Sequence, residues 1–113
     1  MRWFLAGLIV GACMMRAFGH DASEPNADWF NSLKQPQTGI SCCDVADCRA
    51  YDEQSEVRIT DGTYHVLHRG EWLDVPAGKI VERPDNPTGH FVACVHDFGD
   101  TAMVLCAVKG TGT

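Results

Sequence analysis

The chain has 113 residues, with 15 acidic residues against nine lysines and arginines, and its net charge at pH 7 is −6. An acidic chain with no basic stripe repels nucleic acid and anionic membrane surfaces, so these charges disfavour a nucleic-acid-binding role. Six cysteines in so short a chain are typical of a small exported domain that is stabilised by disulfides.

The first 19 residues match a signal peptide. Arg2 gives the positive start, Trp3–Met15 is the apolar run, and residues 17–19 (AFG) place small residues at the cleavage positions. The run is shorter than the about 20 apolar residues of a membrane span. We therefore expect cleavage after residue 19, a mature chain that starts at His20, and a periplasmic or secreted protein without a stable membrane span.

Two alternatives to cleavage after residue 19 stay open. Residues 10–13 (VGAC) loosely match a lipoprotein cleavage box, which would leave a lipid anchor at Cys13. The apolar segment could also remain uncleaved as an anchor.

The N-terminal part of the mature chain, residues 20–54, predicts little regular structure. His20–Asn26 is a polar arm without periodicity. Ala27–Leu33 predicts a short helix, because its large apolar residues recur at helical spacing and a proline follows. Gln35–Tyr51 is rich in Pro, Gly, Ser and Asp, and we expect it to be a loop that holds Cys42, Cys43 and Cys48.

Residues 55–75 predict a three-stranded antiparallel meander. Asp61-Gly62 is a strong signal for a two-residue hairpin turn, and Arg69-Gly70 is a weaker one of the same length. Two loops of two residues fix the register of all three strands. One face is then apolar, and the other carries a charged row. The apolar face pairs Ile59 with Tyr64 and Val75, and Val57 with Val66 and Leu73; the charged row is Arg58, His65 and Asp74.

The rest of the chain predicts a second hairpin. Residues 91–95 and 102–108 are apolar strands around a turn at 97–100, and 109–113 reads as a disordered tail. The predicted fold class is therefore α+β and mostly antiparallel β: a small disulfide-stapled sheet, made of the meander and the C-terminal hairpin, with one short N-terminal helix. We expect residues 55–108 to form this sheet and 27–54 to pack with it as one domain.

Five cysteines remain if Cys13 leaves with the signal peptide. Cys94 and Cys106 lie on the two arms of the predicted hairpin, so we prefer a Cys94–Cys106 bond, which would contribute about 3 kcal/mol. A local bridge among the others would then leave one thiol over. In the alternative, two bonds connect the cysteine cluster to the hairpin. The cluster consists of Cys42, Cys43 and Cys48.

The leftover thiol has three interpretations: a buried free cysteine or an adventitious intermolecular link, a metal ligand, or a redox-active or nucleophilic group. The cysteine spacing is not the Cys-x-x-Cys of thiol oxidoreductases. Asp44 and Asp47 are anionic neighbours, which raise rather than lower the pKa of a thiol. The pattern therefore favours the buried free cysteine, and no catalytic residue is predicted.

The histidines raise a metal hypothesis. As the first residue of a mature chain, His20 would offer its α-amino group and its ring to one ion, as in a copper histidine brace. A second histidine would complete three nitrogen ligands, and imidazole suits copper and zinc. His90 and His96 are the candidates, with His68 as a further one. In the competing interpretation, His20 lies on a mobile arm and binds no metal.

Several motifs resemble those of a group of small exported proteins common in rhizobia and related alphaproteobacteria. The most specific is the SCCDxxDC core at residues 41–48, which follows the segment Trp29–Pro36. The resemblance covers most of the mature chain and implies export and a shared fold, but it transfers no catalytic residue. Its later features are Asp61-Gly62, Gly70-Glu71-Trp72, Val75-Pro76 with Lys79, and the pair Cys94 and Cys106.

The leading hypothesis from the sequence is an exported, non-enzymatic binding module for an unidentified protein or small ligand, without a cofactor. It rests on the disulfide-rich composition and on the lack of any nucleophile–base constellation. The alternative is a periplasmic copper- or zinc-binding protein that uses His20. A thiol enzyme is a third, weaker hypothesis.

Overall fold

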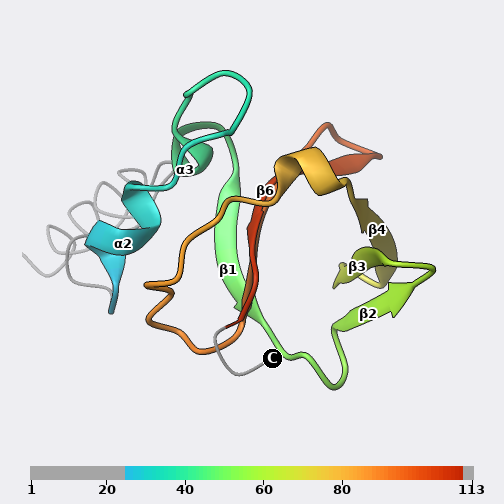
Figure 1. Cartoon of the computed structure of the whole chain (residues 1–113). Coiled ribbons are helices and arrows are strands. Elements are labelled where there is room, and N and C mark those ends of the chain that lie inside the picture. Colours follow the sequence, from blue (N-terminus) through green and yellow to red (C-terminus); the bar gives the residue numbers. More distant parts are fainter. Residues whose placement is uncertain (1–24, 111–113) are drawn as a thin grey trace, which may run out of the picture.

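The computed structural model describes residues 25–110, which form two three-stranded antiparallel sheets with a few short helices (Figure 1). The mostly antiparallel β class is confirmed, but the strands form two sheets rather than one. The predicted signal peptide and most of the predicted arm from residue 20 lie outside the described residues. The elements are α2 (Ala27–Asn31), α3 (Cys42–Val45), β1 (Asp47–Tyr51), β2 (Val57–Thr60), β3 (Thr63–His68), β4 (Glu71–Val75), the 3-10 turn η1 (Ala77–Lys79), β5 (Phe91–Asp97) and β6 (Ala102–Val108).

One sheet consists of β2, β3 and β4 in sequence order, and its predicted register is confirmed. Ile59 lies opposite Tyr64, which lies opposite Val75, and Val66 lies opposite both Val57 and Leu73. Both turns have positive φ at their two central residues, as two-residue hairpins of this kind require. The φ values are 52° at Asp61, 82° at Gly62, 51° at Arg69 and 79° at Gly70.

The other sheet has the order β1-β5-β6, and it corrects the prediction for residues 35–51. These residues are not one loop: they contain helix α3 and strand β1. β1 pairs antiparallel with β5, so that Asp47 lies opposite Val95 and Tyr51 opposite Phe91. A five-residue strand with two charged residues has little strand signal of its own, and its partner residues are 40 to 48 positions away in the chain.

Strand β5 is the centre of the fold because it is buried on both faces. Val92 and Cys94 pack toward α2 and α3, where Phe30 and Leu33 complete a first core cluster. Phe91, Ala93 and Val95 pack toward the other sheet in a second cluster that includes Tyr51, Val66, Leu73 and Val75. The protein therefore has three layers, and sheet β1-β5-β6 is the middle one (Figure 1).

Both disulfides connect the cysteine cluster to the hairpin of β5 and β6. The bonds are Cys42–Cys106 and Cys48–Cys94, and Cys43 is a free, buried thiol. The preferred Cys94–Cys106 pair is therefore wrong, and the alternative with two bonds to the cluster is confirmed. Cys94 and Cys106 do lie opposite each other across the hairpin, but both face the layer that holds the other cysteines.

The predicted disordered tail is also wrong at its first two residues. Gly110 is buried, and the side-chain amide of Asn86 donates hydrogen bonds to the carbonyl oxygens of Lys109, at 3.1 Å, and His90, at 2.8 Å. A Cβ atom at residue 110 would lie 2.7 Å from a carboxylate oxygen of Glu53, so glycine permits this close packing. Residues 111–113 lie outside the described part of the chain.

No helix among residues 25–110 has the length and apolar character that crossing a bilayer requires.

The two disulfides are nested, which sets the expected cost of removing the outer one. While Cys48–Cys94 is intact, the Cys42–Cys106 bond closes only the segments 42–48 and 94–106. We predict that the double variant Cys42→Ala/Cys106→Ala loses about 3 kcal/mol of unfolding free energy, as for a loop of 15 to 20 residues. Urea denaturation under non-reducing conditions measures this loss.

The matched control for this experiment is Cys43→Ala, which removes a buried sulfur but no cross-link, and we expect it to cost about 1 kcal/mol. Peptide mapping of the native protein should yield fragments that join 42 to 106 and 48 to 94. A fragment that joins Cys94 to Cys106 would contradict this disulfide pattern.

Candidate functional site

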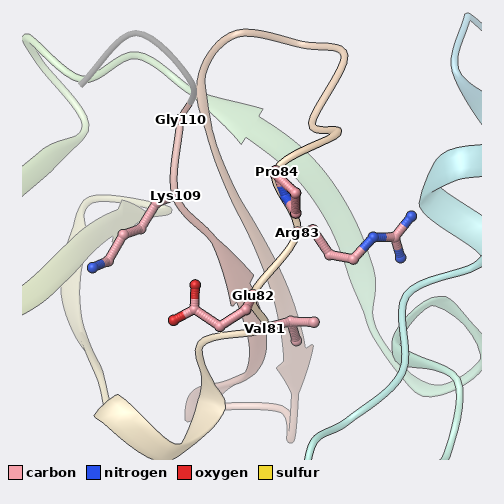
Figure 2. A pocket seen from close by; sticks show the side chains of 6 residues that line it. All are labelled: Val81, Glu82, Arg83, Pro84, Lys109 and Gly110. Carbon is pink, nitrogen blue, oxygen red and sulfur yellow. The ribbon is translucent and has the colours of Figure 1, made fainter.

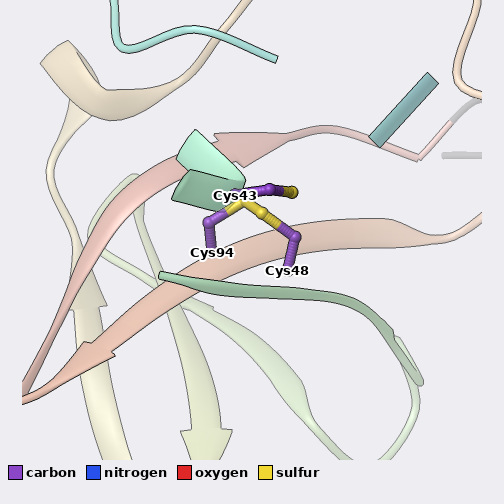
Figure 3. A group of neighbouring side chains, drawn as sticks. All are labelled: Cys43, Cys48 and Cys94. Atoms are coloured by element: carbon purple, nitrogen blue, oxygen red, sulfur yellow. A yellow bond between two sulfur atoms is a disulfide. The ribbon is translucent and has the colours of Figure 1, made fainter. Parts of the chain in front are cut away.

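Three buried sulfur atoms meet between α3 and the middle sheet (Figure 3). The Sγ atoms of Cys43, Cys48 and Cys94 all lie within 4.8 Å of one another. Two of them form the disulfide between the facing residues of β1 and β5, and the third belongs to the free thiol. Since the disulfide sulfurs carry no charge, the three atoms in this oxidation state do not provide three thiolate ligands for a metal.

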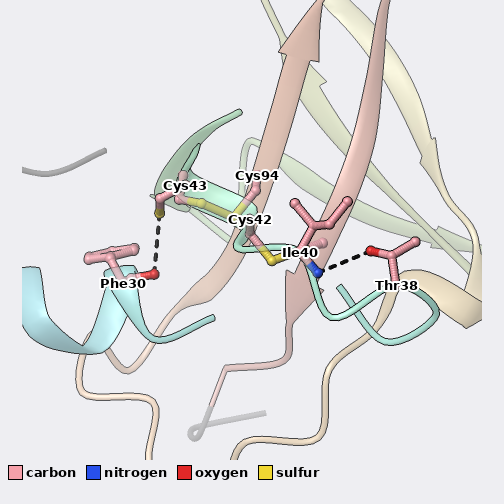
Figure 4. Close-up of a disulfide and its surroundings, with 8 residues drawn as sticks. Phe30, Thr38, Ile40, Cys42, Cys43 and Cys94 are labelled. Carbon is pink, nitrogen blue, oxygen red and sulfur yellow. Dashed lines mark hydrogen bonds between the residues drawn. A yellow bond between two sulfur atoms is a disulfide. The ribbon is translucent and has the colours of Figure 1, made fainter. Parts of the chain in front are cut away.

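The Cys43 thiol is held in its protonated form. It donates a hydrogen bond of 3.2 Å to the carbonyl oxygen of Phe30 in α2 (Figure 4). Burial, followed by the negative charges of Asp44 and Asp47, raises the pKa of Cys43 to about 12. The predicted direction of this shift is thus confirmed, and the thiol lacks the low pKa that activates catalytic cysteines.

A second candidate site is an apolar hollow of about 230 Å³ between the two sheets, beside β2. Val57, Ile59, Tyr64 and Phe91 supply its apolar wall. The rings of Tyr64 and Phe91 are stacked, with centroids 5.2 Å apart. Ile59 is 59% exposed, so the apolar face of β2 predicted from the sequence continues into solvent here. We call this feature, with its four apolar residues, the β2 hollow.

The backbone next to the β2 hollow lies at a sheet edge. Among residues 25–110, β2 pairs only with β3, and the amide of Leu67 donates to the carbonyl of Glu56 at 2.9 Å. Because hydrogen-bonded and non-bonded pairs alternate in an antiparallel ladder, Val57 and Ile59 are at non-bonded positions. Their N–H and C=O groups therefore point away from β3, toward the open edge. The same two residues supply side chains to the β2 hollow.

Glu53 fixes one end of the β2 hollow. Its carboxylate accepts a 2.6 Å hydrogen bond from the amide of Phe91 and lies 2.9 Å from Nδ1 of His90. Burial raises the pKa of Glu53, but these hydrogen bonds outweigh burial and hold the pKa below its usual value. The contacts join the β1–β2 loop to the start of β5, and they keep Phe91 in place against Tyr64.

A third, larger depression of about 360 Å³ is lined by residues 81–84 together with Lys109 and Gly110 (Figure 2). Its charged groups lie on two sides, with Glu82 and Lys109 on one side and Arg83 on the other (Figure 2). Arg83 points away from the depression, toward α2 (Figure 2). Its guanidinium donates two hydrogen bonds of 2.9 Å to the carboxylate of Asp85 and holds the pKa of that carboxyl at about 2. Lys109 extends in the opposite direction (Figure 2). Ligand sites are typically defined by convergent polar groups, which this depression lacks.

The histidines of the metal hypothesis are not brought together. His90 precedes β5 and His96 lies near its end, so six residues of extended chain place them about 20 Å apart. His90 contacts Glu53, and Nδ1 of His96 bonds the carbonyl of Val45. His68 lies 3.1 Å from a carboxylate oxygen of Asp97. His20 is outside the described residues, so a site that joins it to one of these histidines stays a prediction.

The charged row predicted on the outer face of the meander is confirmed. Arg58, His65 and Asp74 lie side by side across the three strands, with Nδ1 of His65 2.9 Å from Asp74. The sequence also predicted the apolar face that contains Val57 and Ile59. It did not indicate that this face stays uncovered at β2, because that depends on how far the two sheets overlap.

Comparisons of this chain with protein-family models, with curated proteins and with solved structures gave no match. Its function is therefore inferred from its own residues.

The role of Glu53 can be tested through pH. We predict that Glu53→Gln lowers the unfolding free energy by about 1–2 kcal/mol at pH 7, because two hydrogen bonds to a carboxylate are weakened. Since the pKa of Glu53 is lowered on folding, its contribution is present above the unfolded pKa of about 4.3 and is lost as the pH falls through the folded pKa. Urea denaturation should thus show the two proteins converging below about pH 4.

Glu71→Gln is the matched control for this pH series. Glu71 is an exposed carboxylate next to the Arg69-Gly70 turn. We expect its replacement to change stability by less than about 0.5 kcal/mol at any pH. If Glu53→Gln behaves in the same way, the hydrogen bonds of Glu53 do not stabilise the fold.

Proposed function

We propose that this protein is an exported, disulfide-stabilised, non-enzymatic binding module that binds an extended segment of a partner protein along β2. The observation that carries the proposal is that the edge backbone of Val57 and Ile59 lies beside an apolar hollow lined by the same two residues. A strand added to a sheet edge gains affinity from main-chain hydrogen bonds and specificity from pockets for alternate side chains.

The size of the β2 hollow supports a peptide side chain as its occupant. About 230 Å³ is below the roughly 300–1,000 Å³ of sites for drug-sized molecules. An apolar side chain of an added strand would cover Ile59 and contact the stacked rings of Tyr64 and Phe91. Full burial of one such side chain contributes about 1.5–3 kcal/mol.

The net charge favours another protein over a second copy of this chain. With a net charge of −6, two copies repel each other, and a neutral or basic segment is attracted. We therefore propose a partner segment that alternates apolar and basic residues.

Export is supported by the chemistry of the cysteines. Two disulfides in a small domain are typical of an oxidising, extracellular compartment. A signal peptide that ends at residue 19 would place the protein there. The absence of an enzymatic role is supported by the protonated, buried state of Cys43.

A defined peptide tests the proposed surface. The probe is an eight-residue peptide of alternating valine and lysine, and the readout is amide hydrogen exchange followed by NMR. We predict that the amides of Val57 and Ile59 exchange about tenfold more slowly at saturating peptide, because they become hydrogen-bonded. Ile59→Lys should weaken binding about tenfold, which corresponds to about 1.4 kcal/mol of lost apolar contact.

Two controls separate strand addition from attraction by charge. Thr101→Lys adds the same charge at an exposed residue of the β5–β6 turn, away from β2, and binding should be retained. A peptide with N-methylated valines keeps its side chains but loses hydrogen-bond donors, and its binding should be lost. Equal binding of both peptides, or exchange changes confined to residues 81–84, would refute the β2 site. A concentration-dependent dimer without peptide would identify a second copy as the occupant.

A further inference from the structure

The position of Cys43 has a chemical consequence beyond the binding role. Among residues 25–110 it is the free cysteine, and its Sγ lies within 4.8 Å of both sulfurs of the Cys48–Cys94 disulfide. A buried thiol in an apolar core needs no such neighbours for packing alone. A thiol and a disulfide at this separation are the two reactants of thiol–disulfide exchange.

We infer that Cys43 and the Cys48–Cys94 disulfide form an intramolecular thiol–disulfide exchange centre. In the exchange, the Cys43 thiolate attacks Sγ of Cys94. The Cys43–Cys94 bond forms, the Cys48–Cys94 bond breaks, and Cys48 leaves as a thiolate that takes up the proton lost by Cys43. One disulfide replaces another, so no electrons enter or leave the protein.

The position of each sulfur in the sheet favours attack at Cys94. Cys94 lies on the central strand β5 and is fully buried, whereas Cys48 lies on the edge strand β1 and is 5% exposed. The leaving thiolate is better hydrated at the edge than in the centre of the core. After the exchange, Cys42 and Cys43 would both connect α3 to the β5–β6 hairpin, and β1 would lose its covalent link to β5 while it keeps its backbone pairing and the packing of Tyr51.

The local charges keep this exchange slow at neutral pH. Asp44 on α3 and Asp47 on β1 add to burial in raising the pKa of Cys43 to about 12, so the thiol form predominates strongly at pH 7. The titratable groups on the other packed elements are Asp28 on α2 and His96 and Asp97 at the end of β5, and none of them contributes to this shift. Nδ1 of His96 bonds the carbonyl of Val45. The exchange rate should rise tenfold per pH unit up to about pH 12.

The first test removes the leaving group. In Cys48→Ser, purified from a bacterial periplasm, we expect Cys43–Cys94 to form in addition to Cys42–Cys106. Intact mass would then be four hydrogens below that of the reduced chain, and a peptide fragment would join 43 to 94. In Cys43→Ser, the Cys48–Cys94 bond should remain. If Cys48→Ser carries Cys43 and Cys94 as two alkylatable thiols, the exchange centre is refuted.

The second test follows the exchange in the wild-type protein and does not depend on any cysteine variant folding. The native protein is held at pH 7 to 10, acid-quenched, denatured and labelled with a maleimide, and the labelled cysteine is mapped. We expect the label to move from Cys43 to Cys48 while Cys42 and Cys106 stay unlabelled. A label that stays on Cys43 at every pH, or that reaches Cys42 and Cys106 as fast as Cys48, would overturn the inference.

A matched pair of variants tests whether the Cys43 thiolate is the attacking group. Asp44→Asn removes a charge that raises the pKa of Cys43, and we expect the exchange at pH 9 to become about two- to tenfold faster. Asp28→Asn removes an equal charge from α2 and should leave the rate unchanged. Equal rates in both variants would show that thiolate formation at Cys43 does not control the exchange.

Discussion

The structure depends on the burial of β5 on both of its faces. This strand separates the layer of α2 and α3 from the sheet β2-β3-β4, and it contributes residues to both core clusters. Helices of five and four residues are far too short to be stable alone. Their position is fixed by apolar contact with β5 and by the Cys42–Cys106 bond. A small domain with limited burial gains stability from such cross-links.

The free thiol follows from the same arrangement. Cys42 and Cys43 are adjacent in a helix, so their side chains point about 100° apart. Cys42 reaches Cys106 on β6, while Cys43 faces Phe30 and the Cys48–Cys94 bond. The two sulfurs beside Cys43 are therefore already bonded to each other, in the cross-strand disulfide of β1 and β5. The buried free cysteine was the favoured interpretation of the sequence, but its disulfide neighbours required the tertiary structure.

Local signals made part of the fold predictable. The register of the meander follows from two short turns with positive φ, and each of these is encoded by two adjacent residues. Strand β1 has no such signal, because its pairing with β5 joins residues that are 40 to 48 positions apart. The disulfide pattern was mispredicted for a related reason. Cys94 lies opposite Cys106 across the hairpin, and only the placement of α3 and β1 determines that each bonds elsewhere.

The β2 hollow shows that the alternation of apolar and polar residues predicts which face of a strand is apolar, but not how much of that face is buried. Alternation correctly predicts that Val57 and Ile59 share the apolar face with Val66 and Val75, yet Val66 is fully buried and Ile59 is 59% exposed. This difference in exposure arises because the sheet β2-β3-β4 contacts the middle sheet through β4, which packs beside β6. Strand β2 lies at the opposite edge, where the middle sheet covers it less. An apolar face left uncovered next to free backbone groups has a cost in water that a bound strand would remove. Binding at β2 would therefore complete a face that the chain itself covers only in part.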